Sequence, residues 1–144
     1  MSSATVVVGV DGSPSSDAAL SWAIAEAKLR NAPLKVVCCW TIPGLYLSEA
    51  YIAPEPLALE KSARATLDEA MGRVADAEDP LLATERLVLE GSPSRVLLDV
   101  SEGASLLVVG ARGRGGFIGL LVGSVASQVV NHAVCPVVVV PKPD

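Results

Sequence analysis

Short apolar runs alternate with longer segments of helical periodicity along this chain, and this alternation limits the possible folds more than any other feature. The runs that predict strands are rich in valine and leucine and cover residues 5–10, 34–40, 84–89, 105–109 and 137–140. Helices are predicted between them at 14–30, 56–77, 93–103 and 124–133. Continuous apolar runs are typical of strands covered on both faces. We therefore expect an α/β fold with an open, doubly wound, five-stranded parallel sheet and helices on both faces.

The predicted helices carry recognisable boundary signals. Ser13 precedes Pro14 as an N-cap precedes a proline at the first helical position, and Asn31 and Pro33 close the same helix. The Gly-Ser-Pro-Ser pattern recurs at 91–94, which we interpret as one strand-to-helix turn used twice. The helix faces expected to point inward carry Leu20, Ala23, Ile24 and Ala27 in the first helix and Leu67, Ala70, Met71 and Val74 in the second.

Size and composition narrow the class of protein. A chain of 144 residues predicts a single domain over 1–144. Its apolar runs are far shorter than the roughly 20 residues of a membrane span, so no membrane partner is expected. The first residues lack a basic region and reach Asp11 early, and the three cysteines show no metal-binding or C-x-x-C spacing, which predicts a cytoplasmic protein. A net charge of −5 without a basic stripe argues against a nucleic-acid partner.

Residues 110–124, GARGRGGFIGLLVGS, form the strongest candidate for a binding site. Six glycines lie here between a predicted strand and a predicted helix. Such a loop brings backbone N–H groups close to an anion, and the following helix adds its positive N-terminal end. Gly110 and Gly113 would let the backbone wrap a phosphate without a Cβ in the way, and Ser124 would cap the helix and donate its hydroxyl. The alternative is a surface loop whose glycines serve turning only.

Other loop features refine this interpretation. Arg112 and Arg114 either reach phosphates or remain solvated charges. No lysine precedes Ser124, so the loop is not a Walker A motif. The first strand is not followed by G-x-G-x-x-G, so hydride chemistry has little support.

Two further strand ends are expected near this loop. Open parallel sheets bind ligands beyond the carboxyl ends of their strands. If the first and fourth strands are neighbours, Asp11 and the loop face one cleft. Asp11 would then bind a ribose hydroxyl, an adenine amine or Mg²⁺; alternatively it is a turn residue that bonds its own backbone two residues on. At the end of the second strand, Cys38, Cys39 and Trp40 would flank the same cleft and offer their backbone to an adenine edge, or their side chains belong to the core. His132 is interpreted as a packing or capping residue.

Taken together, these motifs resemble the universal stress protein family, of the nucleotide-binding kind. The matching segments, in order along nearly the whole chain, are VVGVDGS at 7–13, GSP at 91–93, LVVGARG at 107–113, GSV at 123–125 and CPVVVV at 135–140. The nucleotide signature of the family, G-x2-G-x9-G-[ST], is met by four residues: Gly110, Gly113, Gly123 and Ser124.

The resemblance implies strand order 3-2-1-4-5, an ATP site and a homodimer formed through the last strand. It also implies that Asp11 contacts the nucleoside, that Cys39 meets adenine through its backbone and that the signature residues hold phosphates. The flanking motif residues Gly12, Ser13 and Val125 complete the expected site. Independently, the apolar edge strand Val137–Val140 would pair with a copy of itself, unless the Pro-Lys-Pro tail blunts that edge.

Three functions follow from this reading. The first is an ATP-binding regulator or sensor, with or without Mg²⁺. The second is a slow ATPase, disfavoured because the loop has no lysine and Asp11 is the one convincing carboxylate near it. The third is a dimeric interaction module without a ligand.

Residues 41–55, with Leu45, Tyr46 and Tyr51, are irregular and have the apolar content expected of a lid.

Overall fold

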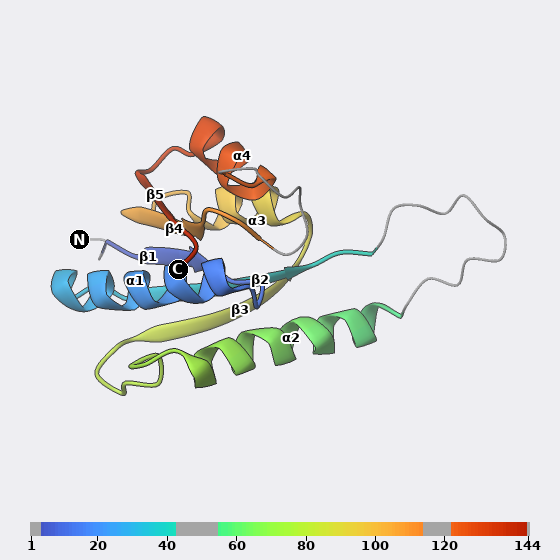
Figure 1. The fold of residues 1–144 in the computed structure, drawn as a ribbon, viewed down its shortest axis with the longest axis horizontal. Coiled ribbons are helices and arrows are strands. Elements are labelled where there is room, and N and C mark those ends of the chain that lie inside the picture. The colour runs from blue at the N-terminus through green and yellow to red at the C-terminus, as the bar shows by residue number, and fades with distance from the viewer. Residues whose placement is uncertain (1–3, 43–54, 114–121, 144) are drawn as a thin grey trace, which may run out of the picture.

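A computed structural model describes residues 4–42, 55–113 and 122–143, which form a three-layer α/β fold (Figure 1). Its five strands are β1 (Val6–Gly9), β2 (Leu34–Trp40), β3 (Thr84–Glu90), β4 (Leu106–Gly110) and β5 (Val137–Val140). Its helices are α1 (Pro14–Arg30), α2 (Pro56–Arg73), α3 (Pro93–Val100) and α4 (Ser124–His132). All neighbouring strands are parallel, in the order β3-β2-β1-β4-β5. The predicted fold class and strand order are confirmed.

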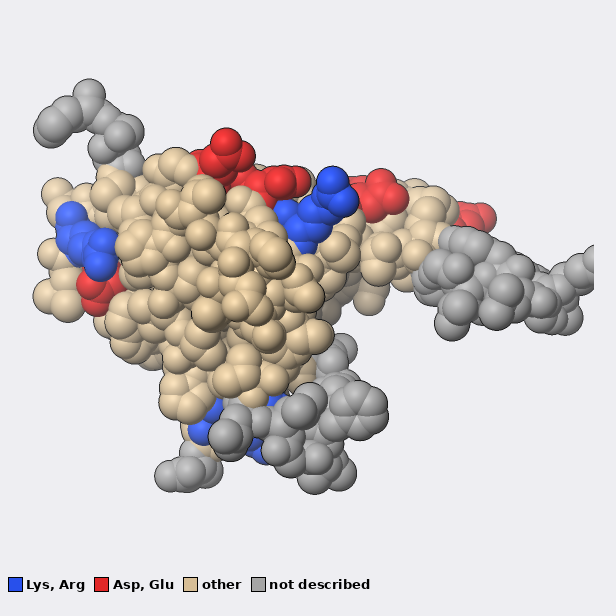
Figure 2. All heavy atoms as spheres, turned by 90° about the horizontal axis from the view of Figure 1, so that it is seen from above, with Lys and Arg blue, Asp and Glu red and all other residues tan. Residues whose placement is uncertain are grey.

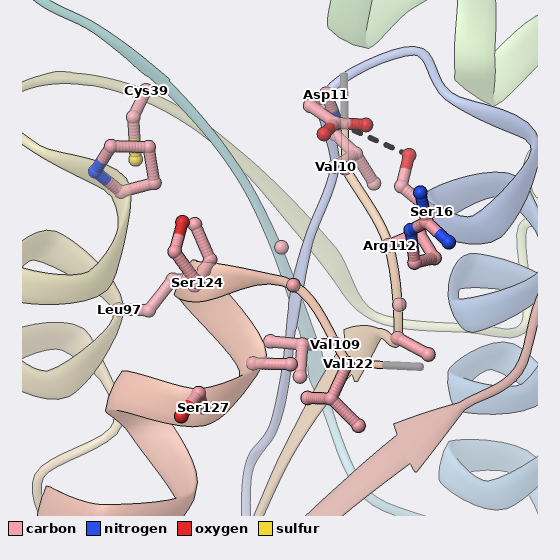
Figure 3. Close-up of a pocket in the computed structure, with 18 of the residues that line it drawn as sticks. Val10, Asp11, Ser16, Cys39, Leu97, Val109, Arg112, Val122, Ser124 and Ser127 are labelled. Atoms are coloured by element: carbon pink, nitrogen blue, oxygen red, sulfur yellow. Dashed lines mark hydrogen bonds between the residues drawn. The ribbon is translucent and has the colours of Figure 1, made fainter. Parts of the chain in front are cut away.

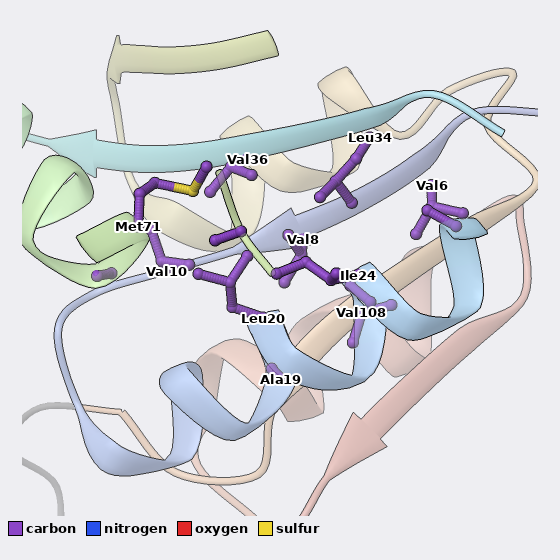
Figure 4. Packing of buried hydrophobic residues seen from close by; sticks show 14 of the residues in the cluster. Val6, Val8, Val10, Ala19, Leu20, Ile24, Leu34, Val36, Met71 and Val108 are labelled. Carbon is purple, nitrogen blue, oxygen red and sulfur yellow. The ribbon is translucent and has the colours of Figure 1, made fainter. Parts of the chain in front are cut away.

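The sheet separates two apolar layers, because successive side chains of a strand point to opposite faces. Val6, Val8 and Val10 pack with α1 and α2, as Figure 4 shows for part of this layer. Val7 packs with α3 and α4 on the other face. The residues predicted to face inward from the first two helices are all buried except Val74, which is partly buried and packs against the same cluster.

The helix ends follow the sequence signals closely, with two corrections. Ser13 caps α1 by accepting a hydrogen bond from the Ser16 N–H at 3.2 Å, and Asn31 closes it with a left-handed φ of 52°. The prediction that the second helix continues to Ala77 is wrong: α2 ends at Arg73, and Asp76 has a φ of 67° that a helix cannot continue through. The third helix ends three residues earlier than predicted, at Val100, before a turn.

Some predictions fall on residues outside the described ranges. These are the lid segment with Leu45, Tyr46 and Tyr51, and Arg114 in the glycine loop. None of the described helices combines the length and the apolarity that crossing a bilayer requires.

Candidate functional site

A cleft of about 590 Å³ lies at the carboxyl ends of the central strands, within the range of about 300–1,000 Å³ typical of ligand pockets (Figure 3). The chain leaves β1 toward β2 on one side and reaches β4 on the other, so the strand order reverses here. This is the place where open parallel sheets bind ligands. The walls come from the ends of β1, β2 and β4, from α3 and from the first turn of α4.

Most of the residues predicted for the site do line this cleft. They are Asp11, Cys39, Gly110, Arg112, Gly113, Gly123, Ser124 and Val125. Gly12 and Ser13 are not among the lining residues, because they form the turn that leads into α1. Asp11 and the described ends of the glycine loop face one cleft, as predicted, while the binding role of each residue stays a prediction.

Asp11 takes part in both arrangements that the sequence left open. Its Oδ1 accepts a hydrogen bond from the Ser13 N–H at 2.9 Å, which is the turn that a short carboxylate favours. Its Oδ2 faces Gly113, since a Cβ built on that glycine would lie 2.8 Å from this oxygen. The Asp11 N–H donates to Ser16 Oγ at 3.1 Å, drawn as a dashed line in Figure 3. Asp11 is therefore a turn residue whose second oxygen belongs to the cleft.

Gly110, the last residue of β4, and Gly113, shortly after it, are glycines for different structural reasons. Gly113 is exposed, and its missing side chain leaves room beside Asp11. Gly110 instead packs against α1: a Cβ there would lie 2.7 Å from the carbonyl carbon and 2.8 Å from the carbonyl oxygen of Ser15. Packing on protein backbone is thus a structural reason for Gly110, while its predicted role beside phosphate stays a prediction.

The start of α4 points backbone donors at the cleft. The first intrahelical acceptor, the carbonyl of Gly123, takes the N–H of Ser127. The preceding N–H groups of Ser124, Val125 and Ala126 have no acceptor within the helix. With the positive end of the helix dipole, they make this terminus suited to an anion.

The expectation that Ser124 caps this helix is wrong. Gly123 is the N-cap, and Ser124 is the first helical residue. Among the described residues, no side chain caps the terminus. Ser124 lines the cleft from within the first turn of the helix.

The end of β2 forms another wall. Gly9, the last residue of β1, pairs with Val37, so β2 continues for three residues past β1 and its edge borders the cleft at Cys39. Burial, and secondarily the neighbouring Cys38, raises the pKa of the Cys39 thiol to about 12. The thiol is therefore neutral near pH 7 and does not act as a nucleophile. His132 is exposed at the far end of α4 and does not line the cleft.

Sequence reasoning missed the contribution of α3. Pro93 and Leu97 line the cleft, and a Cβ on Gly9 would lie 2.8 Å from Leu97 Cδ1. A glycine inside a strand often marks such a close approach, so Gly9 was the available signal. Without it, nothing in the pattern of α3 separates a residue facing the cleft from a core residue.

Charged side chains are few in this cleft. Among its described lining residues, Asp11 is the acidic one and Arg112 the basic one. The part of the chain that the structure describes contains no group of three or more His, Cys, Asp or Glu side chains able to hold a metal ion. The described lining residues therefore offer a carboxylate, a guanidinium, two hydroxyls on α4 and backbone donors.

Comparison with known proteins agrees with this architecture. Residues 3–141 match the model of the universal stress protein family. The chain belongs to this family. A universal stress protein from Mycobacterium tuberculosis is 41% identical over 138 residues, which cover 94% of this chain and 44% of that protein. The chain thus spans less than half the length of the mycobacterial relatives it matches.

Solved structures of universal stress proteins with bound nucleotides are among those similar to this chain. One, in complex with cAMP, has a TM-score of 0.72 and 30% sequence identity, and covers 99% of this chain and 100% of that chain. Another, from Archaeoglobus fulgidus in complex with dAMP, has a TM-score of 0.68 and 26% identity, and covers 97% and 99%. Nucleotide binding is thus found among structural relatives of this universal stress protein.

Proposed function

We propose that this universal stress protein binds ATP in the cleft and acts as a nucleotide-dependent regulator or sensor. One observation carries the proposal: the cleft at the switch point of the sheet joins a carboxylate, Asp11, to the first turn of α4, whose leading N–H groups have no acceptor within the helix. A nucleotide has matching ends, since its ribose hydroxyls suit the carboxylate and its phosphates suit the helix terminus. The relatives with bound cAMP and dAMP support an adenine nucleotide.

The proposed placement follows the walls of the cleft. The nucleoside lies between Asp11 and the end of β2, where the edge of Cys39 is open to the cleft and the Leu97 side chain offers an apolar surface. The phosphates lie toward Gly113 and the N–H groups of Ser124 and Val125. Arg112 adds positive charge at the same end. Mg²⁺ commonly takes one or two carboxylates plus phosphate oxygens, so Asp11 fits as one protein ligand when the metal arrives with ATP.

The side chains that line the cleft favour binding of ATP without rapid hydrolysis. Phosphoryl transfer requires neutralised charge and a positioned nucleophile. The described lining residues include no lysine, and one oxygen of Asp11 is already held by the turn. Titration calorimetry with ATP, followed by chromatography of the nucleotide, tests both parts. We expect saturable binding and intact ATP; turnover at ordinary enzymatic rates would favour the ATPase instead.

We further propose that the protein forms a homodimer along β5. This strand is a sheet edge, and no Asp, Glu, Lys or Arg occurs in residues 115–141. Figure 2 views the molecule from the side of α4 and shows a broad face with charged residues only toward its margins. Val130 and Val134 are 54% and 78% exposed within this region. An uncharged face beside an open edge is suited to pairing with a second copy.

Sedimentation velocity of two charge variants tests the dimer. Val134→Asp places a charge on the proposed interface, and Leu81→Asp places one at a residue that is 93% exposed in the turn before β3. We expect the first variant to dissociate and the second to remain dimeric. Equal sedimentation of both variants with wild type would exclude this face as the interface.

The cytoplasm is the proposed compartment. Cys38, Cys39 and Cys135 form no disulfide, and Cys38 is buried within β2. Free thiols are the usual state of cysteines in a reducing compartment.

A further inference from the structure

Ser15 is a buried polar residue that does not line the cleft. It lies in the first turn of α1 and is 1% exposed. Its hydroxyl accepts a hydrogen bond from the Arg112 N–H at 3.2 Å and donates one to the Val140 carbonyl at 3.4 Å. A hydroxyl has one proton and two lone pairs, so the bond to Val140 directs the proton away and leaves a lone pair for Arg112. Ser15 therefore joins α1 to the exit of β4 and to the end of β5.

The surroundings of Ser15 hold both ends of the glycine loop. The Val140 carbonyl also accepts the Ala111 N–H at 2.7 Å, and the Ala111 carbonyl in turn accepts the Gly123 N–H. Arg112 begins the loop and Gly123 ends it, so one connected set of hydrogen bonds fixes its two ends. The absence of a Cβ on Gly110 lets β4 approach Ser15 closely enough for this arrangement.

Adjacent serines of α1 hold different sides of the cleft. Ser16 Oγ accepts the N–H of Asp11, which is the proposed nucleoside side. Ser15 Oγ accepts the N–H of Arg112, directly before Gly113 on the proposed phosphate side. The two contacts are separate hydrogen bonds to separate strand ends. Loss of the Ser15 hydroxyl therefore removes one support from the phosphate side, while Asp11 keeps its own support.

We propose that Ser15 is a positioning residue for the phosphate end of the cleft, acting through the backbone of Arg112. This inference rests on the proposed function, because it assigns to Ser15 a part in holding the nucleotide's phosphates. The hydroxyl orients the peptide group that leads into Gly113. Without the Ser15 hydroxyl, ATP must order that peptide group when it binds. Adenosine has no phosphate, so its binding does not require that peptide group to be ordered.

Calorimetry of Ser15→Ala with ATP and with adenosine tests the inference. One hydrogen bond corresponds to a loss of roughly threefold to tenfold in ATP affinity, and we expect adenosine affinity to stay within about twofold of wild type. Ser101→Ala is the matched control, because Ser101 is 0% exposed, donates its hydroxyl to the Leu98 carbonyl and lies outside the cleft lining. We expect this control to bind both ligands as wild type does.

Amide hydrogen exchange of the nucleotide-free protein supplies a readout that needs no ligand, and its wild-type measurement needs no variant. The Arg112 amide is expected to exchange slowly, and Ser15→Ala to accelerate it. Rapid exchange of Arg112 in wild type would overturn the inference even if the variant failed to fold. Unchanged ATP affinity in Ser15→Ala, or equal losses for ATP and adenosine, would also overturn it while leaving the proposed function intact. Absence of ATP binding by wild type would refute both.

Discussion

Gly113→Ala is the smallest change that tests how the cleft is built. The new Cβ would lie 2.8 Å from Asp11 Oδ2, closer than carbon and oxygen normally approach. The carboxylate cannot rotate away without disturbing the hydrogen bond between its Oδ1 and the Ser13 N–H. The methyl group therefore moves the oxygen that faces the cleft. Gly113 is exposed and meets this one group among the described residues, so the fold is expected to lose less than about 1 kcal/mol.

The expected loss of ATP affinity follows from the bond that Asp11 would make. A hydrogen bond to a charged group contributes about 1.5–3 kcal/mol, which corresponds to roughly a 10- to 100-fold rise in the Kd for ATP. Gly113→Val adds two more methyl groups beside the cleft and is expected to abolish measurable binding. Gly72→Ala is the control, since a Cβ on that α2 glycine meets nothing within 4 Å and only improves helix propensity.

A double-mutant cycle shows whether the effect passes through the carboxylate. Asp11→Ala alone is expected to weaken ATP binding by a similar factor. If Gly113→Ala acts by displacing Asp11, adding it to Asp11→Ala has little further effect, so the two losses are strongly non-additive. Calorimetry on the four proteins gives the coupling directly. Additive losses, or wild-type affinity in Gly113→Ala, would refute the reasoning that places Asp11 Oδ2 and Gly113 against each other at the ligand.

Two other expected outcomes concern stability. Gly110→Ala places a Cβ 2.7 Å from the backbone of Ser15, which has little freedom to move. We therefore expect urea unfolding to show that the free energy of unfolding falls by about 1–3 kcal/mol. A smaller decrease would count against the tight packing of β4 on α1. The hydrogen bond from Lys28, followed by one from the Leu81 N–H, lowers the pKa of Asp79. Its stabilisation is therefore complete above the ordinary aspartate pKa of about 4 and disappears as pH falls through the lower pKa of the folded state. Asp79→Asn is expected to lower the urea midpoint at pH 7 and to match wild type at strongly acidic pH; the same difference at both pH values would contradict this.

The sequence contains most of the information needed for the fold. The valine-rich run of β1 and the cap at Ser13 are local signals, and the structure contains both elements where these signals predict them. The end of α2 was misplaced because the apolar pattern continues to Ala77, which is indeed buried, although the chain reaches that position through a turn rather than a helix. Burial periodicity alone does not distinguish these two paths.

The candidate site was predictable in its parts but not in its detailed contacts. Asp11 and Gly113 were found because turn residues and glycines after strands are visible in a single sequence. The packing of Gly110 on Ser15 was not, because it depends on how closely β4 approaches α1. Leu97 was missed for the same reason: its place in the cleft depends on the distance between α3 and β1.

The most direct test of the central claim is a crystal structure of this protein with ATP. We expect the phosphate oxygens to accept hydrogen bonds from the N–H groups of Ser124 and Val125, with the ribose at Asp11. A cleft that stays empty at saturating ATP, or phosphates bound away from the first turn of α4, would contradict it.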